Sequence, residues 1–291
     1  MGGLQYLHFN FAVRQSNKNS LNTMLIPLGK LQSKYNIIQP RILHVGAHLG
    51  EERGDYQKCG SSKVVWIEAN PELTSALIEK LNALPVCFEM EKVIHAAVAE
   101  IEERATFNVA SNDEASSLLE LGTHQKSYPS IQVEKSISVT TRRIENMAHE
   151  SPDLFGDINF INLDIQGMEL GALKGMGAVL DQVDWIYTEV NRRLVYQNCA
   201  LIWDLDSFLL GQGFERVEVV FTREGWGDAF YIRRRESGAD PRGAYLRRLR
   251  FDYFLWKILE TKCIIFLLNK PIKKTRRGIK KWILRSVNKI K

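Results

Sequence analysis

Gly46, Gly50 and Glu68 have the types and spacing of a ligand site. Both glycines follow a short apolar run in the stretch ILHVGAHLGEE (42–52), and Glu68 ends a second apolar run, VVWIE, about twenty residues later. A strand, a glycine turn, a helix and a strand that ends in an acid form the nucleotide-binding half of a doubly wound sheet. We expect Gly46 to let the backbone approach a ligand and Gly50 to let the next helix pack closely. Because Glu68 could accept hydrogen bonds from ribose hydroxyls, the pattern indicates an adenosine-containing cofactor.

The charge beside the glycine turn favours one such cofactor over another. A dinucleotide site needs GxGxxG, because a pyrophosphate binds backbone N–H groups at a helix N-terminus, whereas this chain has only GAHLG at 46–50. Glu51 and Glu52 follow directly and would repel a phosphate. S-adenosylmethionine carries a sulfonium and an ammonium group and no phosphate, so the local charge favours it over NAD. A glycine pair that only packs a helix in another α/β protein is the alternative.

Polar side chains stand at the ends of four predicted strands. They are His44 and His48 after the first, Glu68 after the second, Asp164 after the fourth and Glu189 after the fifth. In an open α/β sheet the ligand lies outside the carboxyl ends of the strands, and several acids at one edge usually signal a site. Asp164 and Glu189 could act as a general base, bind a metal ion or hold a substrate hydroxyl. Solvated loop acids or helix caps are the alternative.

Alternating strands and helices are predicted around these residues. Strands are expected at 41–47, 63–68, 93–99, 105–111, 136–141, 159–165, 184–190, 214–221 and 228–234, and helices at 20–35, 51–59, 71–84, 167–180 and 201–210. The polar segment 112–130 is expected to be a loop over the site. This alternation predicts an α/β fold: a mostly parallel doubly wound sheet, with helices on both faces and a closing antiparallel pair.

Taken in chain order, the motifs resemble those of FkbM-type S-adenosylmethionine-dependent methyltransferases. The matching pieces are HVGAHLGEE, WIEANPE, the SSLL of 116–119, FINLDIQGMELGALKG, IYTEVN and GWGDAFYI, which cover most of residues 36–234. The resemblance implies a class I methyltransferase (Rossmann-like) fold. It also implies O-methylation, often of sugar hydroxyls in glycans or natural products.

The resemblance also assigns residues to the cofactor site. His44, Gly46, Ala47, Gly50 and Glu68 match its cofactor motif. His48, Glu51, Ala69 and Asn70, which lie beside them in the chain, are also expected to bind the cofactor. Asp164, Gly167 and Glu169 match the DxxGxE motif of the family.

His44 and His48 depart from the family pattern. Many relatives carry Asp at the first position and Asn at the second, and the Asp helps to hold the ammonium group of the cofactor. Because His44 supplies no negative charge, Glu51 or Glu52 is expected to take that part. A histidine packed at the strand end is the alternative for both positions.

Methyl transfer to a sugar hydroxyl calls for a general base, because the hydroxyl is a poor nucleophile. Asp164 is the first candidate, Glu189 the second, and His124 in the predicted loop the third. Mg²⁺ or Mn²⁺ held by Asp164 and Glu189 could instead lower the pKa of the hydroxyl, and the sequence leaves base and metal open. The residues expected near the acceptor are Ser116, Ser117, Trp226 and Asp228. A packing role is the alternative for Trp226.

Charge divides the chain into an acidic body and a basic C-terminal segment. The net charge is +5, but residues 242–291 hold sixteen Lys and Arg against two Asp and Glu, which leaves −9 on the remainder. Ile279, Trp282, Ile283, Val287 and Ile290 share one helical face there, as in a helix lying on an anionic membrane. The longest uncharged run, 263–269, is too short to span a bilayer. A nucleic-acid surface and a solvated tail are the alternatives.

These observations predict three parts: an N-terminal helical extension (1–35), a methyltransferase domain (36–236) and a basic amphipathic tail (237–291). Four scattered cysteines and an N-terminus without the pattern of a signal peptide suit a cytoplasmic protein, with the tail on the inner face of the membrane. The main prediction is an O-methyltransferase with a sugar or glycan acceptor. A nucleic-acid methyltransferase, which lacks the support of an NPPY-type motif, and a non-catalytic module of the same fold are the alternatives.

Overall fold

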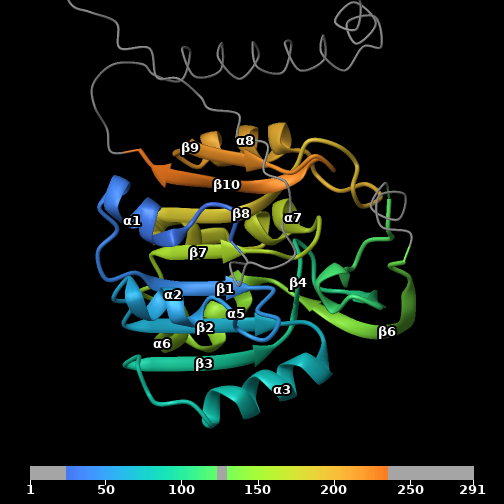
Figure 1. Cartoon of the computed structure of the whole chain (residues 1–291), viewed down its shortest axis with the longest axis horizontal. Coiled ribbons are helices and arrows are strands. Elements are labelled where there is room, and N and C mark those ends of the chain that lie inside the picture. Colours follow the sequence, from blue (N-terminus) through green and yellow to red (C-terminus); the bar gives the residue numbers. More distant parts are fainter. Residues whose placement is uncertain (1–23, 123–129, 235–291) are drawn as a thin grey trace, which may run out of the picture. The chain divides into compact units, whose positions relative to one another are not determined.

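Figure 1 shows the computed structural model, which describes residues 24–122 and 130–234. The main sheet has seven strands in the order β3-β2-β1-β7-β8-β10-β9. These strands are β1 (Arg41–Val45), β2 (Lys63–Glu68), β3 (Met90–His95), β7 (Phe160–Leu163), β8 (Trp185–Asn191), β9 (Phe214–Phe221) and β10 (Trp226–Arg233). Strands β3, β2, β1, β7 and β8 are parallel, and β10 is antiparallel to β8 and β9. The predicted α/β class is confirmed, including its closing antiparallel pair.

Helices cover both faces of this sheet, and each face has its own hydrophobic core. One face packs against α1 (Leu28–Tyr35), α2 (Arg53–Lys58) and α3 (Pro71–Asn82), and the other against α5 (Ile144–Glu150), α6 (Pro152–Phe155), α7 (Glu169–Lys174) and α8 (Ile202–Gly211). Along β1, Ile42 packs in the first core, and Leu43 and Val45 pack in the second. Burial on both faces explains why these strands are apolar at nearly every position.

A second sheet, in the order β4-β6-β5, adjoins the first. Its strands are β4 (Ala97–Val98), β5 (Arg104–Ala110) and β6 (Val133–Arg142). The strands predicted at 105–111 and 136–141 are present as β5 and β6. The single strand predicted at 93–99 is wrong, because the chain there forms parts of β3 and β4. Strand β2 ends at Glu68, opposite His95, so β3 has no partner strand beyond that point.

Two predicted helices differ from the structure by more than their end residues. The helix predicted at 20–35 begins only after Pro27, which is its N-cap. Proline restricts the residue before it to extended conformations, and the described residues before Pro27 are not helical. The helix predicted at 167–180 is divided into α7 and a 3₁₀ helix, η2 (Gly177–Gln182), which starts with Gly177 at a φ of 49°.

The described part of the predicted N-terminal extension, residues 24–35, packs into the core of the domain. The backbone N–H of Leu25 donates to a carboxylate oxygen of Asp228 at 2.7 Å. Residues 1–23 and the predicted tail at 237–291 lie outside the described residues. Within the described part of the chain, no helix is both long and apolar enough to cross a membrane.

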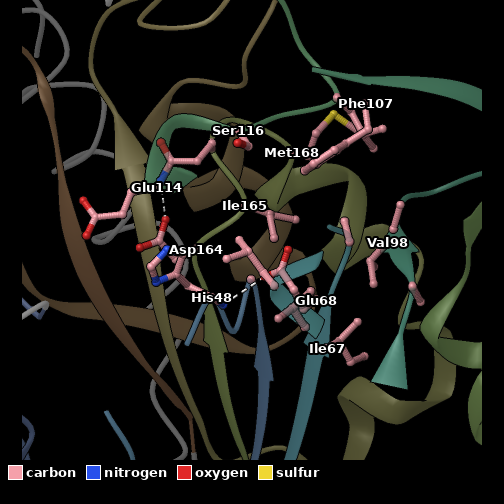
Figure 2. A pocket seen from close by; sticks show the side chains of 18 residues that line it. His48, Ile67, Glu68, Val98, Phe107, Glu114, Ser116, Asp164, Ile165 and Met168 are labelled. Carbon is pink, nitrogen blue, oxygen red and sulfur yellow. Dashed lines mark hydrogen bonds between the residues drawn. The ribbon is translucent and has the colours of Figure 1, made fainter. Parts of the chain in front are cut away.

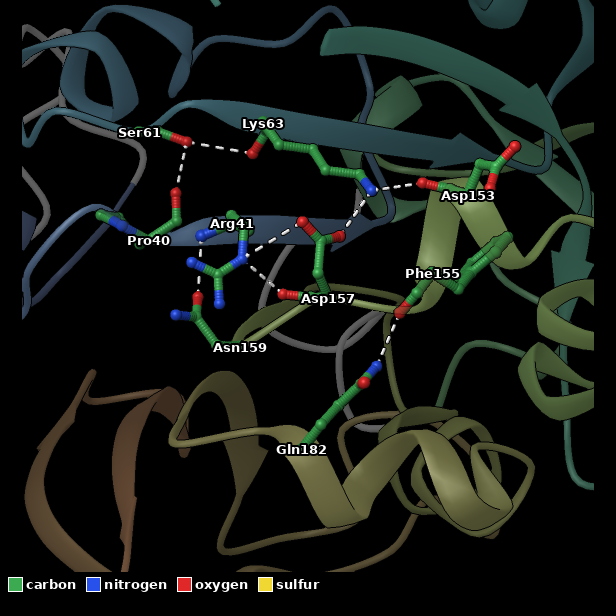
Figure 3. A network of polar contacts seen from close by, with 9 residues as sticks. All are labelled: Pro40, Arg41, Ser61, Lys63, Asp153, Phe155, Asp157, Asn159 and Gln182. Atoms are coloured by element: carbon green, nitrogen blue, oxygen red, sulfur yellow. Dashed lines mark hydrogen bonds and ion pairs between the residues drawn. The ribbon is translucent and has the colours of Figure 1, made fainter. Parts of the chain in front are cut away.

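A polar network joins the amino ends of β1 and β2 to the segment before β7 (Figure 3). Lys63 Nζ donates to a carboxylate oxygen of Asp157 and to the carbonyl oxygen of Asp153, both at 2.6 Å. Arg41 Nε donates to the carbonyl oxygen of Asp157 at 2.6 Å, and the N–H of Arg41 donates to Oδ1 of Asn159 at 2.7 Å. The charges at this edge therefore stabilise the fold, and the pocket lies at the opposite edge.

Candidate active site

A pocket opens at the carboxyl ends of β1, β2 and β7, where open parallel sheets bind their ligands. Its empty volume, open mouth included, is about 690 Å³. Figure 2 shows the side chains that line it. The predicted site residues among them are Gly46, His48, Glu68, Ala69, Ser116 and Asp164.

Gly46 makes the turn after β1 possible by letting two backbone segments meet. Its φ is 87°, and a Cβ atom on it would lie 1.8 Å from the carbonyl oxygen of Asp164. The close approach that we predicted for a ligand is thus made by the turn after β7. Gly50 has a φ of 65°, and a Cβ on it would meet Leu77 of α3 at 3.0 Å, in keeping with the predicted packing role. The contact at Gly46 brings the turns after β1 and β7 together beneath the pocket.

We expect Gly46→Ala to lower the free energy of unfolding by about 3 kcal/mol or more, because the backbone cannot yield to a new Cβ and the φ is unfavourable. Gly54→Ala is the matched control: Gly54 lies in α2 with no atom within 4 Å of the added Cβ, so that alanine should stabilise by about 0.5–1 kcal/mol. Urea unfolding of both variants checks the comparison. Equal stability of the two variants would contradict it.

Glu68 is held at the end of β2 by two backbone donors. Its Oε2 accepts from the N–H of His48 at 2.9 Å, and its Oε1 accepts from the N–H of Asn70 at 2.8 Å. Burial raises the pKa of this carboxyl, and the two backbone hydrogen bonds oppose that shift. Each oxygen keeps acceptor capacity that faces the pocket, so Glu68 can hold ribose hydroxyls in a fixed direction.

The two ends of the pocket differ in polarity (Figure 2). Apolar side chains from both sheets and from the N-cap of α7 gather at one end: Ile67, Val98, Phe107 and Met168. His48, Glu114 and Asp164 gather at the other. Among the described residues that line the pocket there is no Lys or Arg. This arrangement suits a ligand with a flat apolar group at one end and positive charge at the other, and disfavours one that carries phosphates.

Glu169 fixes the turn between β7 and α7. Its buried Oε1 accepts from the N–H groups of Ile165 and Gly167, at 3.2 and 3.0 Å. Burial raises the pKa of its carboxyl to about 7. The last acid of the DxxGxE motif is therefore a turn-holding residue, and the first acid, Asp164, is left to face the pocket.

Asp164 lies just after β7, with its side chain open to the pocket. Asp164 is exposed at the mouth of the pocket, and the protein atoms packed around its carboxyl, followed by the charge of Glu52, raise the pKa of this carboxyl to about 6. Gln166 Nε2 donates to Oδ1 of Asp164 at 2.5 Å. The Asp164 carboxyl is thus largely ionised at neutral pH. Its pKa is still close enough to neutral pH for it to take up a proton.

Glu189 and Asp228 lie deeper than Asp164, on the paired strands β8 and β10. Glu189 accepts from Gln166 Nε2 at 3.0 Å, and burial followed by the charge of Asp164 raises the pKa of Glu189 well above its usual range. Burial raises the pKa of Asp228 to about 7, and its Oδ2 accepts from Leu25 and from the hydroxyl of Tyr187. Neither acid lines the pocket, so the structure favours Asp164 over Glu189 as the group that meets an acceptor.

His44 lies beneath the pocket and does not line it. Its ring is buried against Trp66, and Nδ1 lies 3.0 Å from the hydroxyl of Tyr56. Asn162 Nδ2 donates to the same hydroxyl at 2.7 Å. Burial lowers the pKa of His44 to about 4, so the ring is neutral. The geometry therefore favours the packed alternative for this position.

The other residues predicted to bind the cofactor have different positions in the structure. Ala47 is buried in the core, and Asn70 caps α3 by accepting from the N–H of Glu72 at 3.0 Å. Glu51 contacts the ring of His48 at 3.0 Å and raises its pKa.

Of the residues predicted to lie near the acceptor, some line the pocket and others do not. Ser116 lines the pocket, whereas Ser117 is buried and its hydroxyl donates to the carbonyl oxygen of Gln166 at 2.8 Å. Trp226 packs against the small cluster of Val195, Tyr196 and Cys199. His124 lies outside the described residues.

Sequence reasoning missed Glu114, Gln166, Phe107 and Met168, all of which line the pocket. Gln166 stands inside the DxxGxE motif and could have been noticed there. Phe107 lies in β5, Glu114 lies in the short 3₁₀ helix η1 (Asp113–Ala115) that follows β5, and Met168 is the N-cap of α7. Their approach to the pocket is a tertiary feature.

No group of three or more His, Cys, Asp and Glu side chains in the described ranges could hold a metal ion. The two carboxylates named as metal ligands, Asp164 and Glu189, are bridged by the amide of Gln166.

Comparison with known proteins identifies the family. The family model described as "Methyltransferase FkbM domain" matches residues 44–216, more than half of the chain. The chain belongs to the FkbM methyltransferase family. It is therefore an S-adenosylmethionine-dependent methyltransferase, as the motif order indicated. No curated protein sequence matches the chain.

Solved structures resemble this FkbM methyltransferase only distantly. One is the magnesium protoporphyrin IX methyltransferase of Synechocystis PCC 6803 with bound SAM, at 12% identity and a TM-score of 0.41, covering 71% of this chain and 76% of that one. A SAM-dependent methyltransferase from Aquifex aeolicus is 13% identical, with a TM-score of 0.37 and coverages of 71% and 88%. A protein of the NADB-Rossmann superfamily from Streptococcus agalactiae is 14% identical, with a TM-score of 0.45 and coverages of 94% and 99%.

The pocket of this family member fits S-adenosylmethionine. Glu68 can accept from the ribose, and the apolar end beside Phe107 suits an adenine ring. The acidic end, with Glu114 and Asp164 and without a described Lys or Arg, suits the sulfonium and ammonium charges. None of these described residues could form an ion pair with a phosphate group.

Proposed function

We propose that this FkbM methyltransferase methylates a hydroxyl group of a sugar, in a glycan or a glycosylated natural product. The observation that supports O-methylation is the Asp164 carboxylate, which opens on the acidic end of the pocket with its pKa raised to about 6. A base with that pKa is ionised at neutral pH and can take the proton of a hydroxyl. The support for a sugar acceptor comes from the resemblance of the motifs.

In the proposed reaction the protein orients the reactants and removes a proton. When bound, the cofactor supplies an electrophilic methyl group: transfer to the hydroxyl oxygen breaks the carbon–sulfur bond and leaves its electron pair on sulfur. Asp164 accepts the hydroxyl proton, and Gln166 keeps the carboxylate in place during that step. Glu68 fixes the ribose, so the methyl group and the hydroxyl can be held in line. A base of this kind contributes about 10²–10⁴ in rate.

A screen with S-adenosylmethionine labelled in its methyl group tests the acceptor class. The panel contains oligosaccharides, RNA and peptides, each incubated with the full-length protein. We expect label in the oligosaccharide fraction only. Label in RNA, with none in sugar, would contradict the proposal and favour a nucleic-acid methyltransferase.

We also propose that residues 242–291 attach the enzyme to anionic membranes and are not needed for chemistry. Their charge of +14, against −9 for the remainder, supports this, since each Lys or Arg near a negative leaflet adds about 1 kcal/mol. Truncation at about Gly238 should abolish sedimentation with anionic vesicles and leave binding of S-adenosylhomocysteine unchanged. Equal sedimentation of both proteins would exclude the tail as the anchor, and binding of the full chain to RNA but not to vesicles would favour the nucleic-acid alternative.

A further inference from the structure

Residues 116–122, which we call the strap, run from the second sheet to the loop that follows β8. Ser116 and Leu118 of the strap line the pocket, and Ser117 between them does not (Figure 2). At its first end the strap pairs with β5: the N–H of Ser117 donates to the carbonyl oxygen of Asn108 at 3.1 Å, and the N–H of Asn108 donates back at 2.8 Å. The strap is therefore part of the pocket wall.

The other end of the strap is fastened to the loop after β8 by a short antiparallel bridge, which we call the clasp. Leu121 and Tyr196 are the paired residues of this bridge. Two backbone hydrogen bonds flank them at 3.0 and 2.9 Å, from the N–H of Gly122 to the carbonyl oxygen of Val195 and from the N–H of Gln197 to that of Glu120. The pocket wall is thus tied to the main sheet through the clasp.

The clasp requires glycine at position 122, because two backbone segments touch there. A Cβ atom on Gly122 would lie 2.7 Å from the carbonyl oxygen of Leu194 and 2.8 Å from that of Val195. A backbone carbonyl cannot move aside as the end of a side chain can, so any other residue would push the strap away from the loop. Gly122 does not line the pocket, so a substitution there changes the clasp and leaves the lining residues as they are.

The clasp can open without disturbing the main cores of the domain. Leu119 and Leu121 pack against Val195, Tyr196 and Cys199, and this small cluster is separate from the two cores that cover the main sheet. Two backbone hydrogen bonds and a small cluster form a unit of low local stability, of the kind that opens while the rest of a protein stays folded.

We propose that the clasp controls the exchange of the cofactor: the strap closes the pocket while the clasp is formed, and its release lets S-adenosylmethionine enter and S-adenosylhomocysteine leave. The hydroxyl of Ser117 donates to the carbonyl oxygen of Gln166 at 2.8 Å, which places the strap beside the turn that carries Asp164. Closure at this end would keep water from the reacting methyl group. The inference concerns the cofactor and not the acceptor, so it can fail without affecting the proposed methylation of a sugar.

A disulfide across the clasp tests this proposal directly. Leu121 and Tyr196 lie between the two flanking hydrogen bonds, and a pair of this kind has Cα atoms about 4.5 Å apart, which a disulfide can span. The full-length double variant, Leu121→Cys with Tyr196→Cys, is compared in its oxidised and reduced forms by surface plasmon resonance. Oxidation should slow both association and dissociation of S-adenosylhomocysteine by about tenfold or more and leave Kd nearly unchanged. Wild type oxidised in the same way is the control, because the native Cys199 packs beside Tyr196.

Gly122→Ala tests the opposite change. The added Cβ forces the strap away from Val195, so S-adenosylhomocysteine should dissociate about tenfold faster or more, and the amides of residues 116–122 should exchange hydrogen faster. Gly211→Ala is the matched control and should leave both rates unchanged, since Gly211 ends α8 with no atom within 4 Å of the added Cβ.

Three results would overturn the proposal. The first is equal exchange rates for the oxidised and reduced forms of the double variant. The second is failure of the two introduced thiols to pair, as judged by mass spectrometry of the peptides, because the clasp would then not exist. The third is faster amide exchange in Gly122→Ala with dissociation at the wild-type rate, which would make the strap a structural element only.

Discussion

Asp164→Asn is expected to lower methyl transfer by about 10²–10⁴ while leaving the fold intact. An amide has nearly the shape of the carboxylate and can still accept from Gln166, but it cannot take up the proton of a hydroxyl. The measurement is single-turnover transfer from labelled S-adenosylmethionine, with an acceptor found in the screen.

Asp157→Asn is the matched control for that substitution. Asp157 lies at the opposite edge of the sheet, where it accepts from Lys63, so its loss should affect stability and not transfer. Near-normal turnover of Asp164→Asn would make Asp164 a structural acid.

The turnover of the wild type should depend on pH through the ionisation of the Asp164 carboxyl. The pKa of Asp164 in the folded protein is raised to about 6, and the base must be ionised to act. Turnover should therefore fall about tenfold per pH unit below that value and level off above it.

Glu68→Ala is expected to weaken cofactor binding by about 1.5–3 kcal/mol, the size of hydrogen bonds to a charged acceptor. We expect the wild type to bind in the micromolar to millimolar range. Calorimetry with S-adenosylhomocysteine measures the loss, and an analogue without the two ribose hydroxyls provides the control because it should bind both proteins equally. If the variant loses as much affinity for the analogue, Glu68 acts by holding the N–H groups of His48 and Asn70 and not by contacting the ribose.

The sheet could be predicted from the sequence because its strands carry local signals. Apolar runs that end in Glu68 and Asp164 marked the carboxyl edge, and both acids line the pocket there. The boundary between β3 and β4 could not be predicted, because it depends on where the neighbouring strand β2 ends.

The candidate site was predicted less completely, because its contacts join segments that are far apart in the sequence. Gly46 meets a carbonyl of another strand, and a sequence shows that a glycine is present but not what approaches it. His44 faces the core under α2, whereas its neighbour by two residues, Gly46, reaches the pocket at the start of the turn. The bridge from Gln166 to Asp164 and Glu189 joins three side chains whose distances only the folded chain defines.

The most direct test of the proposed O-methylation is to locate the transferred methyl group. The product formed from ¹³C-methyl-labelled S-adenosylmethionine is purified, and heteronuclear NMR shows the atom to which the labelled carbon is bonded. We expect a methyl ether on a sugar hydroxyl oxygen, formed by the wild type and lost with Asp164→Asn. A labelled methyl group on nitrogen, or on a nucleobase, would contradict it.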